Sequence, residues 1–345
     1  MINHERYLRR CIELSKLSNG LNRPNPEVGS VIVCNNTIIG EGYHKCYGQA
    51  HAEVNAIASV DDQSLLAEST IYVTLEPCFH FGKTPPCVEL ILKHKIPRVV
   101  IGCTDPYHEV AGKSIEKLRK AGVEVTVGIL NEEVECLNRR FFTNVRNNRP
   151  FIVLKYAVSA DGFMGRTGEN LQISGPISKR WVHKLRSEEA AILVGTETAL
   201  SDNPQLNVRH YFGPQPLRLV LDRTLRLPDN LHLFDGTQPT AVFTENFKVS
   251  EIENLEYIQI PFGTNDFLFK MLDSLYKMRI VSVLVEGGAS LLNSFLASGL
   301  WDEAYILRSN NVRLESGIEA PQIQAKYFTE RSILGEDSLE HYQHK

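Results

Sequence analysis

Apolar positions along the first part of the chain change from a helical period to short strand-like blocks. Near the start they recur at i, i+3 and i+4, which predicts an amphipathic helix that carries Tyr7, Leu8, Cys11, Ile12, Leu14 and Leu17. Further on, the pattern predicts strands over 28–34, 37–42, 70–75, 98–102 and 123–127, and helices over 51–60, 85–95, 114–122 and 131–145. The first two strands meet at a tight Asn35-Asn36 turn. The alternation that follows predicts a sheet that is mostly parallel after the hairpin and covered on its faces.

A second α/β pattern begins beyond residues 146–150, a polar stretch that ends in Pro150 and is the best candidate linker. Here the pattern predicts strands over 151–159, 190–195, 217–221, 240–244, 257–260, 281–285 and 303–307, and helices over 176–186, 265–279 and 289–298. A chain of 345 residues, at about 150 residues per domain, holds about two domains. We therefore expect one domain over 1–146 and another over 147–345.

Composition excludes several classes of protein. Hydrophobic residues make up 43% of the chain and charged residues 23%, as in ordinary globular proteins. The net charge of −4 disfavours electrostatic binding to nucleic acid or an anionic membrane. The sequence has no apolar run of membrane-spanning length, and MINHERYLRR has no apolar signal core, so we expect a cytoplasmic protein. Seven cysteines do not suggest a disulfide framework, so some thiols are expected to be metal ligands or core residues.

Three residues have the types and the surroundings of a catalytic zinc site. His51 opens a predicted helix, Cys78 follows a predicted strand, and Cys87 lies near the start of the next helix. One imidazole and two thiolates suit Zn²⁺, and three protein ligands leave a fourth tetrahedral position for water, whose pKa zinc lowers to about 7. The alternatives are a closed structural zinc with His80 as the fourth ligand, or buried thiols with no metal.

Glu53 is the candidate proton carrier of this site. Residues at i and i+2 do not share a helix face, so Glu53 need not bind the metal together with His51. Its expected role is to move a proton from the water to a leaving amine. H-x-E followed by P-C and a second cysteine is the pattern of zinc deaminases. Cytidine and tRNA adenosine deaminases carry P-C-x-x-C, whereas eight residues separate Cys78 from Cys87 here.

The first domain contains a set of distinctive segments. They are PNPEVGSVIV (24–33), EGYH (41–44), HAEVNA (51–56), YVTLEPC (72–78), PCFHFGKTPPC (77–87), the Asp-Pro pair 105–106 and VAGK (110–113). Together they closely resemble one family, the bifunctional deaminase/reductase of riboflavin biosynthesis. The resemblance implies a cytidine-deaminase-like α/β/α domain with a mixed sheet. It implies deamination of 2,5-diamino-6-(5-phosphoribosylamino)pyrimidin-4(3H)-one, in which the 2-amino group becomes an oxo group and ammonia is released.

The same resemblance implies a substrate pocket lined by Asn25, His44, His80 and Lys83. On the residues alone, Asn25 between two prolines is as much a turn residue as a ligand, and His44 and Lys83 would more often be surface residues. Two positions depart from the family. Ser30 stands where Cys is frequent, and Tyr107-His108 replaces the usual Asn-Pro after the Asp-Pro pair.

The second domain resembles the fused reductase of this family, which has a dihydrofolate-reductase-like α/β fold. The similar segments are LKYAVSADG (154–162), AAILVGTETALSDNPQLNVR (190–209) and VLVEGGASLLNSFL (283–296). The resemblance implies that NADPH reduces the ribosyl group of 5-amino-6-(5-phosphoribosylamino)uracil to ribityl. A Rossmann domain is not supported, because no G-x-G-x-x-G with a downstream acidic residue follows an early strand.

The resemblance also implies positions for both reductase ligands. NADPH is expected near Ala157, Thr198, Asp202, Gly287 and Gly288, and substrate near Lys155, Asn170, Arg186, Leu206, Arg209 and Glu286. Glycines between a strand and a helix let phosphates approach backbone N–H groups, although a lone Gly-Gly pair is more often a turn without a ligand. Arg186 and Arg209 offer forked donors suited to phosphate, although either one alone is more often a solvated cation. Gln172 stands where the family usually has Trp, which removes a large surface on the cofactor side.

Two other functions stay open on the sequence. One is a deaminase whose second domain does not reduce, and the other is a nucleic-acid base deaminase that acts on a flipped base. The balanced charge, the cysteine spacing and the lack of an aromatic-basic stripe weigh against the nucleic-acid deaminase. Because the family assembles through its reductase domain, the resemblance implies a homodimer or a larger homo-oligomer.

Overall fold

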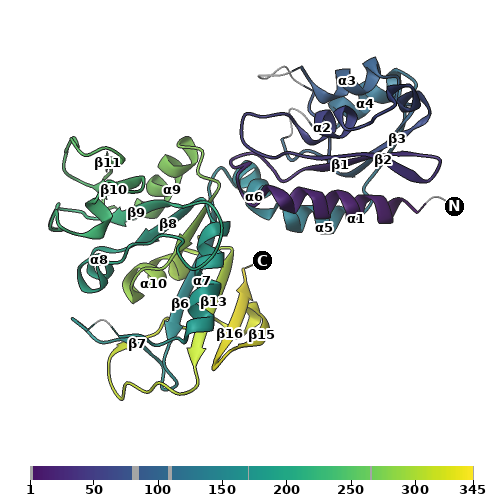
Figure 1. The fold of residues 1–345 in the computed structure, drawn as a ribbon. Coiled ribbons are helices and arrows are strands. Elements are labelled where there is room, and N and C mark those ends of the chain that lie inside the picture. Colours follow the sequence, from purple (N-terminus) through teal and green to yellow (C-terminus); the bar gives the residue numbers. More distant parts are fainter. Residues whose placement is uncertain (1–2, 80–84, 108–110, 170, 265, 345) are drawn as a thin grey trace. The chain divides into compact units, whose positions relative to one another are not determined.

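The computed structural model describes residues 3–79, 85–107, 111–169, 171–264 and 266–344. The chain forms two compact units, Met1–Asn148 and Arg149–Lys345 (Figure 1). Each unit is built from one main sheet with helices packed on it, so the predicted α/β class is confirmed. No helix among the described residues has the length and the apolar character that crossing a bilayer requires.

The first unit contains a five-stranded mixed sheet. Its strands are β1 (Gly29–Cys34), β2 (Thr37–Tyr43), β3 (Thr70–Leu75), β4 (Arg98–Cys103) and β5 (Glu124–Val127). They lie in the order β2-β1-β3-β4-β5. Strand β1 is antiparallel to β2 and β3, whereas β3, β4 and β5 are parallel. The sequence pattern therefore predicted both the hairpin and the parallel part of the sheet.

Helices cover both faces of this sheet. They are α1 (His4–Ser15), α2 (Ala52–Ala58), α3 (Cys87–Lys93), α4 (Lys113–Lys120), α5 (Asn131–Leu137) and α6 (Arg139–Asn147), with short 3-10 turns at Lys16–Ser18 and Gln63–Glu68. Successive strand residues point to opposite faces. Ile71 and Val73 of β3 accordingly pack in the cluster that contains α2, α3 and α4, whereas Tyr72 packs with α1. A fully buried central strand thus supplies two core layers.

The helix predicted over 131–145 is two helices that meet at Asn138, so this prediction was wrong in detail. Asn138 is buried and leaves the helical conformation, with φ −101° and ψ 19°. Its side-chain oxygen accepts from the Glu27 N–H at 2.7 Å, and its amide donates to the Glu27 carbonyl at 3.0 Å. A contact between distant parts of the chain therefore breaks a helix that local periodicity predicts to be continuous.

The second unit is built on a nine-stranded sheet. Its strands are β6 (Phe151–Val158), β8 (Ala191–Val194), β9 (Leu217–Leu221), β10 (Thr240–Thr244), β11 (Leu255–Gln259), β12 (Ser282–Val285), β13 (Glu303–Ser309), β15 (Phe328–Leu334) and β16 (Asp337–Gln343). The order is β11-β10-β9-β8-β12-β6-β13-β16-β15. In this order, neighbouring strands from β11 to β13 pair in parallel, and β16 and β15 add an antiparallel edge. This mixed sheet places the carboxyl ends of β8, β12 and β6 side by side.

Four longer helices cover the second sheet: α7 (Pro176–Glu188), α8 (Thr196–Asp202), α9 (Phe267–Lys277) and α10 (Ala289–Ser298). Residues of α7 and α8 share a buried cluster with Phe151 and Val153 of β6. Helices α9 and α10 share the opposite cluster with Ile152 and Leu154 (Figure 1). The period-two alternation along β6 therefore supplies both core layers of this unit too.

Several elements of the second unit were not predicted from the sequence. They are helix α8, the small β7 (Phe163–Gly165) and β14 (Ile318–Glu319) pair, the β15–β16 hairpin, and 3-10 turns at His232–Phe234 and Ala325–Tyr327. All seven residues of β15 are at least partly exposed. An edge strand with so little buried surface lacks the apolar alternation on which strand prediction depends.

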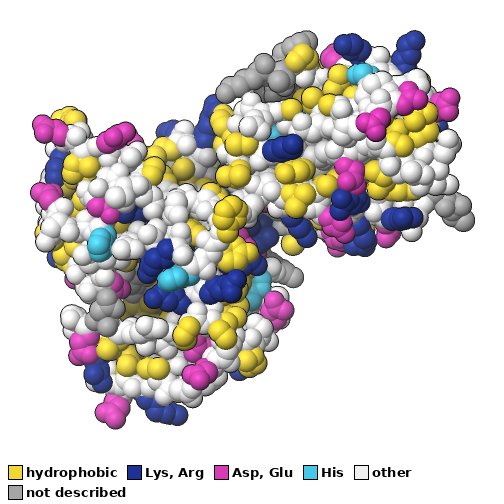
Figure 2. All heavy atoms as spheres, in the orientation of Figure 1, with side chains coloured by type: hydrophobic (Ala, Val, Ile, Leu, Met, Phe, Trp, Pro, Cys, Tyr) yellow, Lys and Arg dark blue, Asp and Glu magenta, His cyan; other side chains and the backbone are white. Residues whose placement is uncertain are grey.

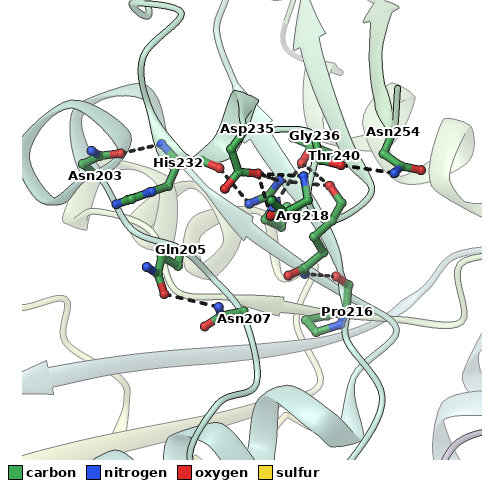
Figure 3. A network of polar contacts seen from close by, with 12 residues as sticks. Asn203, Gln205, Asn207, Pro216, Arg218, His232, Asp235, Gly236, Thr240 and Asn254 are labelled. Carbon is green, nitrogen blue, oxygen red and sulfur yellow. Dashed lines mark hydrogen bonds and ion pairs between the residues drawn. The ribbon is translucent and has the colours of Figure 1, made fainter. Parts of the chain in front are cut away.

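Arg218 of β9 is a fully buried cation that ties three segments together (Figure 3). Its Nε donates to Thr240 Oγ1 of β10 at 2.8 Å, and Nη1 donates to the His232 carbonyl at 2.8 Å. Its Nη2 donates to the Gln238 carbonyl at 2.9 Å and lies 3.0 Å from Asp235 Oδ1. A guanidinium with every nitrogen engaged satisfies a buried charge and fixes the loop between β9 and β10.

We expect Arg218→Ala to lower the free energy of unfolding of the second unit by about 2–3 kcal/mol, because it removes the four hydrogen bonds of the buried guanidinium and leaves a cavity in its place. The two tryptophans of the chain, Trp181 and Trp301, both lie in this unit, so tryptophan fluorescence during urea unfolding reports on it alone. Arg223→Ala is the matched control, because Arg223 forms an exposed pair with Glu245 that is expected to contribute less than about 1 kcal/mol. Equal effects of the two substitutions would contradict a structural role for the buried network.

Candidate active sites

The first unit brings the three predicted zinc ligands together. His51 immediately precedes α2, Cys78 lies three residues beyond β3, and Cys87 is the first residue of α3. His51 Nδ1 lies 3.5 Å from Cys78 Sγ and 3.4 Å from Cys87 Sγ. All three ligand atoms lie within 4.8 Å of one another. Two helix starts and one strand end therefore converge on a single point.

The spacing of these atoms fits Zn²⁺. Zn–S bonds of about 2.3 Å and Zn–N bonds of about 2.0–2.1 Å at tetrahedral angles separate a nitrogen ligand from a sulfur ligand by about 3.6 Å. The observed separations of 3.4 and 3.5 Å are close to this value. Two thiolates would also balance the charge of the ion. The donor set and its geometry thus suit a zinc ion with three protein ligands.

Hydrogen bonds favour the thiolate form of Cys78. The Cys87 thiol donates to it, the Cys87 backbone N–H reaches Cys78 Sγ at 3.2 Å, and His51 adds a further contact. Together these contacts, led by the Cys87 thiol, lower the pKa of Cys78 below the ordinary thiol value against the opposing effect of burial. A preformed thiolate is the form in which cysteine binds a metal.

Glu53 is buried beside this cluster, with only 3% of its surface exposed. Burial, and then the neighbouring Cys78, raise the pKa of Glu53 to about 7. Among the described residues, the group of mutually close ligand atoms consists of His51, Cys78 and Cys87 and does not include Glu53. This position suits a carboxyl that exchanges protons near the metal rather than one that binds it.

Asn25 and His44 are joined by a hydrogen bond next to His51. His44 Nδ1 lies 3.1 Å from the Ala50 carbonyl, which can only accept, so Nδ1 carries the proton. Burial lowers the pKa of His44, so the ring is neutral and its Nε2 accepts from the Asn25 amide at 3.0 Å. The Asn25 side-chain oxygen is then left to accept from another donor. The two rings of His44 and His51 meet edge to face at 5.4 Å.

Glu76 is a buried site residue to which sequence reasoning assigned no role. It accepts from Ser114 Oγ at 2.6 Å, from the Gly112 N–H at 2.9 Å and from the Asp105 N–H at 3.3 Å. It therefore joins Asp105 of the Asp-Pro pair to Gly112 and Ser114 at the start of α4. Asn55 was missed as well, and its amide donates to the carbonyls of Tyr43 and Ala50. Glu76 lies in the YVTLEPC motif and Asn55 in HAEVNA, and membership of these motifs is the signal that could have found both residues.

Three of the predicted substrate residues, His80, Lys83 and Asn170, lie outside the described residues.

In the second unit, the predicted Gly287–Gly288 turn and Thr198 come together. Gly287 follows β12, and a side chain at this position would lie 2.8 Å from the Gly195 nitrogen at the end of β8. Close packing of these strand ends is therefore one reason for glycine here. The Gly288 N–H donates to Thr198 Oγ1 of α8 at 2.8 Å. Asp202 is exposed and lies four residues after Thr198 in α8. Because residues at i and i+4 are neighbours on a helix, these two predicted cofactor residues share a face.

Lys155, Arg186 and Glu286 form a buried charged cluster at the strand ends. Arg186 Nε and Nη2 each donate to one Glu286 oxygen at 2.9 Å, and Lys155 Nζ lies 3.8 Å from Glu286. Burial opposes ionisation of Glu286, but Arg186 and Lys155 outweigh it and lower its pKa to about 2. Arg186 Nη1 also donates to the Asn207 carbonyl at 3.2 Å. Each nitrogen of this guanidinium already has an acceptor within the protein.

The other predicted reductase residues surround this cluster. Arg209 is exposed and donates to Asn207 Oδ1 at 2.7 Å. Leu206 is buried in a left-handed conformation, with φ +50°. Ala157 lies two residues after Lys155 in β6 and pairs with Leu307 of β13. Gln172 is exposed, and its amide donates to the Ser174 carbonyl. Ala157, Arg186 and Glu286 thus lie on or next to neighbouring elements at one edge of the sheet.

Comparisons with known proteins agree with this two-part geometry. Residues 1–103 match the family described as the cytidine and deoxycytidylate deaminase zinc-binding region, and residues 150–308 match the RibD C-terminal domain. The chain is 39% identical to the riboflavin biosynthesis protein RibD of Aquifex aeolicus, over 87% of this chain and 85% of that protein. It is 34% identical to RibD of Escherichia coli, over 93% of this chain and 95% of the relative.

Solved structures extend the likeness to the whole chain. RibD of Acinetobacter baumannii superposes with a TM-score of 0.89 at 32% identity, covering 99% of both chains. A diaminohydroxyphosphoribosylaminopyrimidine deaminase/5-amino-6-(5-phosphoribosylamino)uracil reductase from Thermotoga maritima gives a TM-score of 0.88 at 35% identity, again over 99% of both chains. The chain therefore belongs to the RibD family of bifunctional riboflavin biosynthesis enzymes, which join a zinc-binding deaminase domain to an NADPH-dependent reductase domain.

Proposed function

We propose that this protein catalyses two successive steps of riboflavin biosynthesis on one phosphorylated substrate. A deaminase domain, residues 1–146, removes the 2-amino group of 2,5-diamino-6-(5-phosphoribosylamino)pyrimidin-4(3H)-one as ammonia. A reductase domain, residues 147–345, then reduces the ribosyl group of 5-amino-6-(5-phosphoribosylamino)uracil to ribityl with NADPH. The observation that carries the proposal is the convergence of His51, Cys78 and Cys87 beside the buried Glu53, in a chain that also contains the reductase unit.

Each residue of the deaminase site has a defined task. His51, Cys78 and Cys87 would hold zinc, which when bound makes hydroxide available at neutral pH. Glu53 takes up a proton from the attacking water and delivers it to the departing amine, for which its pKa of about 7 is suited. Asn25 orients the pyrimidine through the side-chain oxygen that His44 leaves free. His80 and Lys83 complete the proposed pocket.

The reductase residues bind and orient two ligands. NADPH, when bound, supplies the hydride. Ala157, Thr198, Asp202 and the Gly287–Gly288 turn are assigned to the cofactor, because they lie at the carboxyl edge of the parallel strands, where α/β sheets bind ligands. Substrate is assigned to Lys155, Asn170, Arg186, Leu206, Arg209 and Glu286. Lys155 and Glu286 present fixed opposite charges to the sugar, since Arg186 holds Glu286 in one orientation.

We further propose that the enzyme is cytoplasmic, takes a small-molecule substrate rather than nucleic acid, and assembles as a homodimer or larger through the reductase domain. Turnover of the diaminopyrimidine ribosyl phosphate with and without NADPH tests the whole proposal. Ammonia release should occur with and without NADPH. When NADPH is present, its absorbance should fall in step with the release of ammonia. Ammonia release with no oxidation of NADPH would leave a deaminase with a non-reducing second domain.

Glu53→Gln should retain about one zinc per chain, as measured by atomic absorption, while ammonia release falls at least about 100-fold, because the proton carrier is lost. Reduction of the deaminated substrate by the same variant is the internal control and should match the wild type. Loss of zinc from this variant would make Glu53 a ligand and contradict its assigned role.

Cys87→Ser should lose zinc and deaminase activity together, because a serine hydroxyl is a poor zinc ligand at neutral pH. The reductase step should continue, since Cys87 lies in the other unit. A variant that keeps its full zinc content would point to His80 as the true third ligand. Metal content and the two activities, measured on one preparation, separate these outcomes.

Glu286 should stabilise the second unit in a pH-dependent way. Its pKa is about 2 in the folded protein and 4.5 in the unfolded reference. The resulting stability of about 3 kcal/mol is therefore complete above pH 4.5 and is lost as the pH falls toward 2. The difference in unfolding free energy between wild type and Glu286→Gln, followed by tryptophan fluorescence, should be constant from about pH 7 to 5 and shrink below pH 4.5. A difference that stays constant to pH 3 would contradict the ionised, paired state of Glu286.

A further inference from the structure

Two side-chain amides, those of Asn22 and Asn55, hold the segments that carry Asn25 and His44. Neither amide has been given a task above, although Asn25 and His44 form a hydrogen-bonded pair in the proposed deaminase pocket. Both amides donate to backbone carbonyls rather than to side chains. What they control is therefore the placement of the main chain that carries the pair.

Asn22 holds both main-chain groups of Asn25. Its carbonyl accepts from the Asn25 N–H at 3.0 Å, and its side-chain amide donates to the Asn25 carbonyl at 2.9 Å. Asn22 is 1% exposed, and its Oδ1 has no hydrogen-bond partner among the described residues. Leaving a buried oxygen unpaired costs at least as much stability as one neutral hydrogen bond returns. Stability alone therefore does not explain an asparagine at this position.

Asn55 of α2 fixes the acceptor that orients His44. Its amide donates to the Tyr43 carbonyl at 2.8 Å and to the Ala50 carbonyl at 3.3 Å. The Ala50 carbonyl also accepts from His44 Nδ1 at 3.1 Å, and a carbonyl oxygen can accept two hydrogen bonds. The Tyr43 carbonyl belongs to the peptide group that precedes His44. Asn55 thus holds His44 through the preceding peptide group and through the hydrogen-bond partner of its ring.

The proton on His44 Nδ1 decides which end of the Asn25 amide is left for a ligand. With Nδ1 protonated, His44 Nε2 accepts from the Asn25 amide nitrogen at 3.0 Å, and Asn25 Oδ1 is left to accept. If the Ala50 carbonyl turned away, the proton could move to Nε2, and Asn25 would then present its nitrogen to the ligand. The amino groups of the proposed pyrimidine substrate donate hydrogen bonds, so an oxygen at this place can bind them, whereas an amide nitrogen cannot.

Surface charge gives little orientation to a ligand on the face of the first unit that Figure 2 shows. Acidic and basic side chains are intermingled on this face of the unit that holds α1 to α6. Charges of both signs in close alternation produce no field of a single sign toward an anionic substrate. The orientation of the pyrimidine therefore depends on short-range hydrogen bonds such as that of Asn25.

We propose that Asn22 and Asn55 are positioning residues of the deaminase site, which act through Asn25 and His44 to keep the Asn25 oxygen turned toward the pyrimidine. This inference rests on the proposed function. Asn22 holds the main chain of Asn25, and Asn55 holds the carbonyls on either side of His44 in the sequence. Their loss weakens binding of the pyrimidine and leaves the proton transfer at Glu53 in place.

The test is Asn22→Ala and Asn55→Ala, made singly in the full-length enzyme, with the diaminopyrimidine ribosyl phosphate as substrate. We expect the deaminase KM to rise at least about fivefold, because the acceptor for the pyrimidine is no longer fixed. The deaminase kcat should stay within about threefold, zinc at about one per chain, and the reductase step as in the wild type. Gln63→Ala is the matched control. The Gln63 amide also donates to two carbonyls, those of Ile57 and Val60, but at the far end of α2, so this variant should keep the wild-type KM.

Double variants show whether the two amides act through Asn25. Asn25→Ala removes the oxygen itself, so adding Asn22→Ala or Asn55→Ala to it should change the KM by less than about twofold. Asn22→Leu and Asn55→Asp keep the branched shape of the side chain but cannot donate to the carbonyls. They should raise the KM at least as much as the alanine variants, and they keep the test decisive where an alanine variant does not fold.

Three results would overturn the inference. An unchanged KM in either single variant would remove the role of that residue. Effects that multiply in the double variants would show that the amides do not act through Asn25. A fall in kcat together with a loss of zinc would assign the amides to the metal site instead. Failure of the proposed function is distinguishable from all three, because the wild type itself would then release no ammonia from this substrate.

Discussion

A carboxylate at the end of a buried strand must be paired or neutralised, and this constraint shapes both halves of the molecule. Glu76 follows β3 and Glu286 follows β12, each at the carboxyl edge of its sheet. Donors from the next loop and helix satisfy Glu76, namely two backbone N–H groups and the Ser114 hydroxyl. Two buried cations satisfy Glu286. Because an unpaired buried charge is expensive, each glutamate fixes the loops and helices that supply its partners.

The pattern of apolar residues predicted those helices and strands whose formation depends on residues close together in the sequence. The strand predicted at 70–75 has the same bounds in the structure. It is a short run of mostly β-branched and aromatic residues, all of them buried, whose side chains point alternately into two core layers. The break at Asn138 was missed, because its cause is a pair of hydrogen bonds to Glu27 more than a hundred residues earlier. Strand β15 was missed for the opposite reason, since an exposed edge strand carries little apolar signal.

The site residues show the same difference between what local motifs reveal and what depends on distant partners. His51, Cys78 and Cys87 could be proposed together from residue type and motif, and their ligand atoms do converge. A pairing such as that of Arg186 with Glu286 has no local signature, because a hundred residues separate the partners. Sequence reasoning therefore considered Arg186 for phosphate without its partner, whereas three of its five N–H donors are used within the protein.

Two buried glutamates illustrate how the surroundings, rather than the side chain, decide the chemistry. Burial disfavours the charged form of both Glu53 and Glu286. Near Glu286 stand Arg186 and Lys155, which reverse the effect and hold a permanent anion. Near Glu53 stands the thiolate of Cys78, which adds to the effect of burial, so the pKa rises to about 7. One carboxyl is thereby suited to exchange protons, and the other to hold a fixed charge that orients a ligand. In the proposed mechanism the deaminase step uses the first kind of carboxyl and the reductase step uses the second, and each lies in the unit assigned to its step.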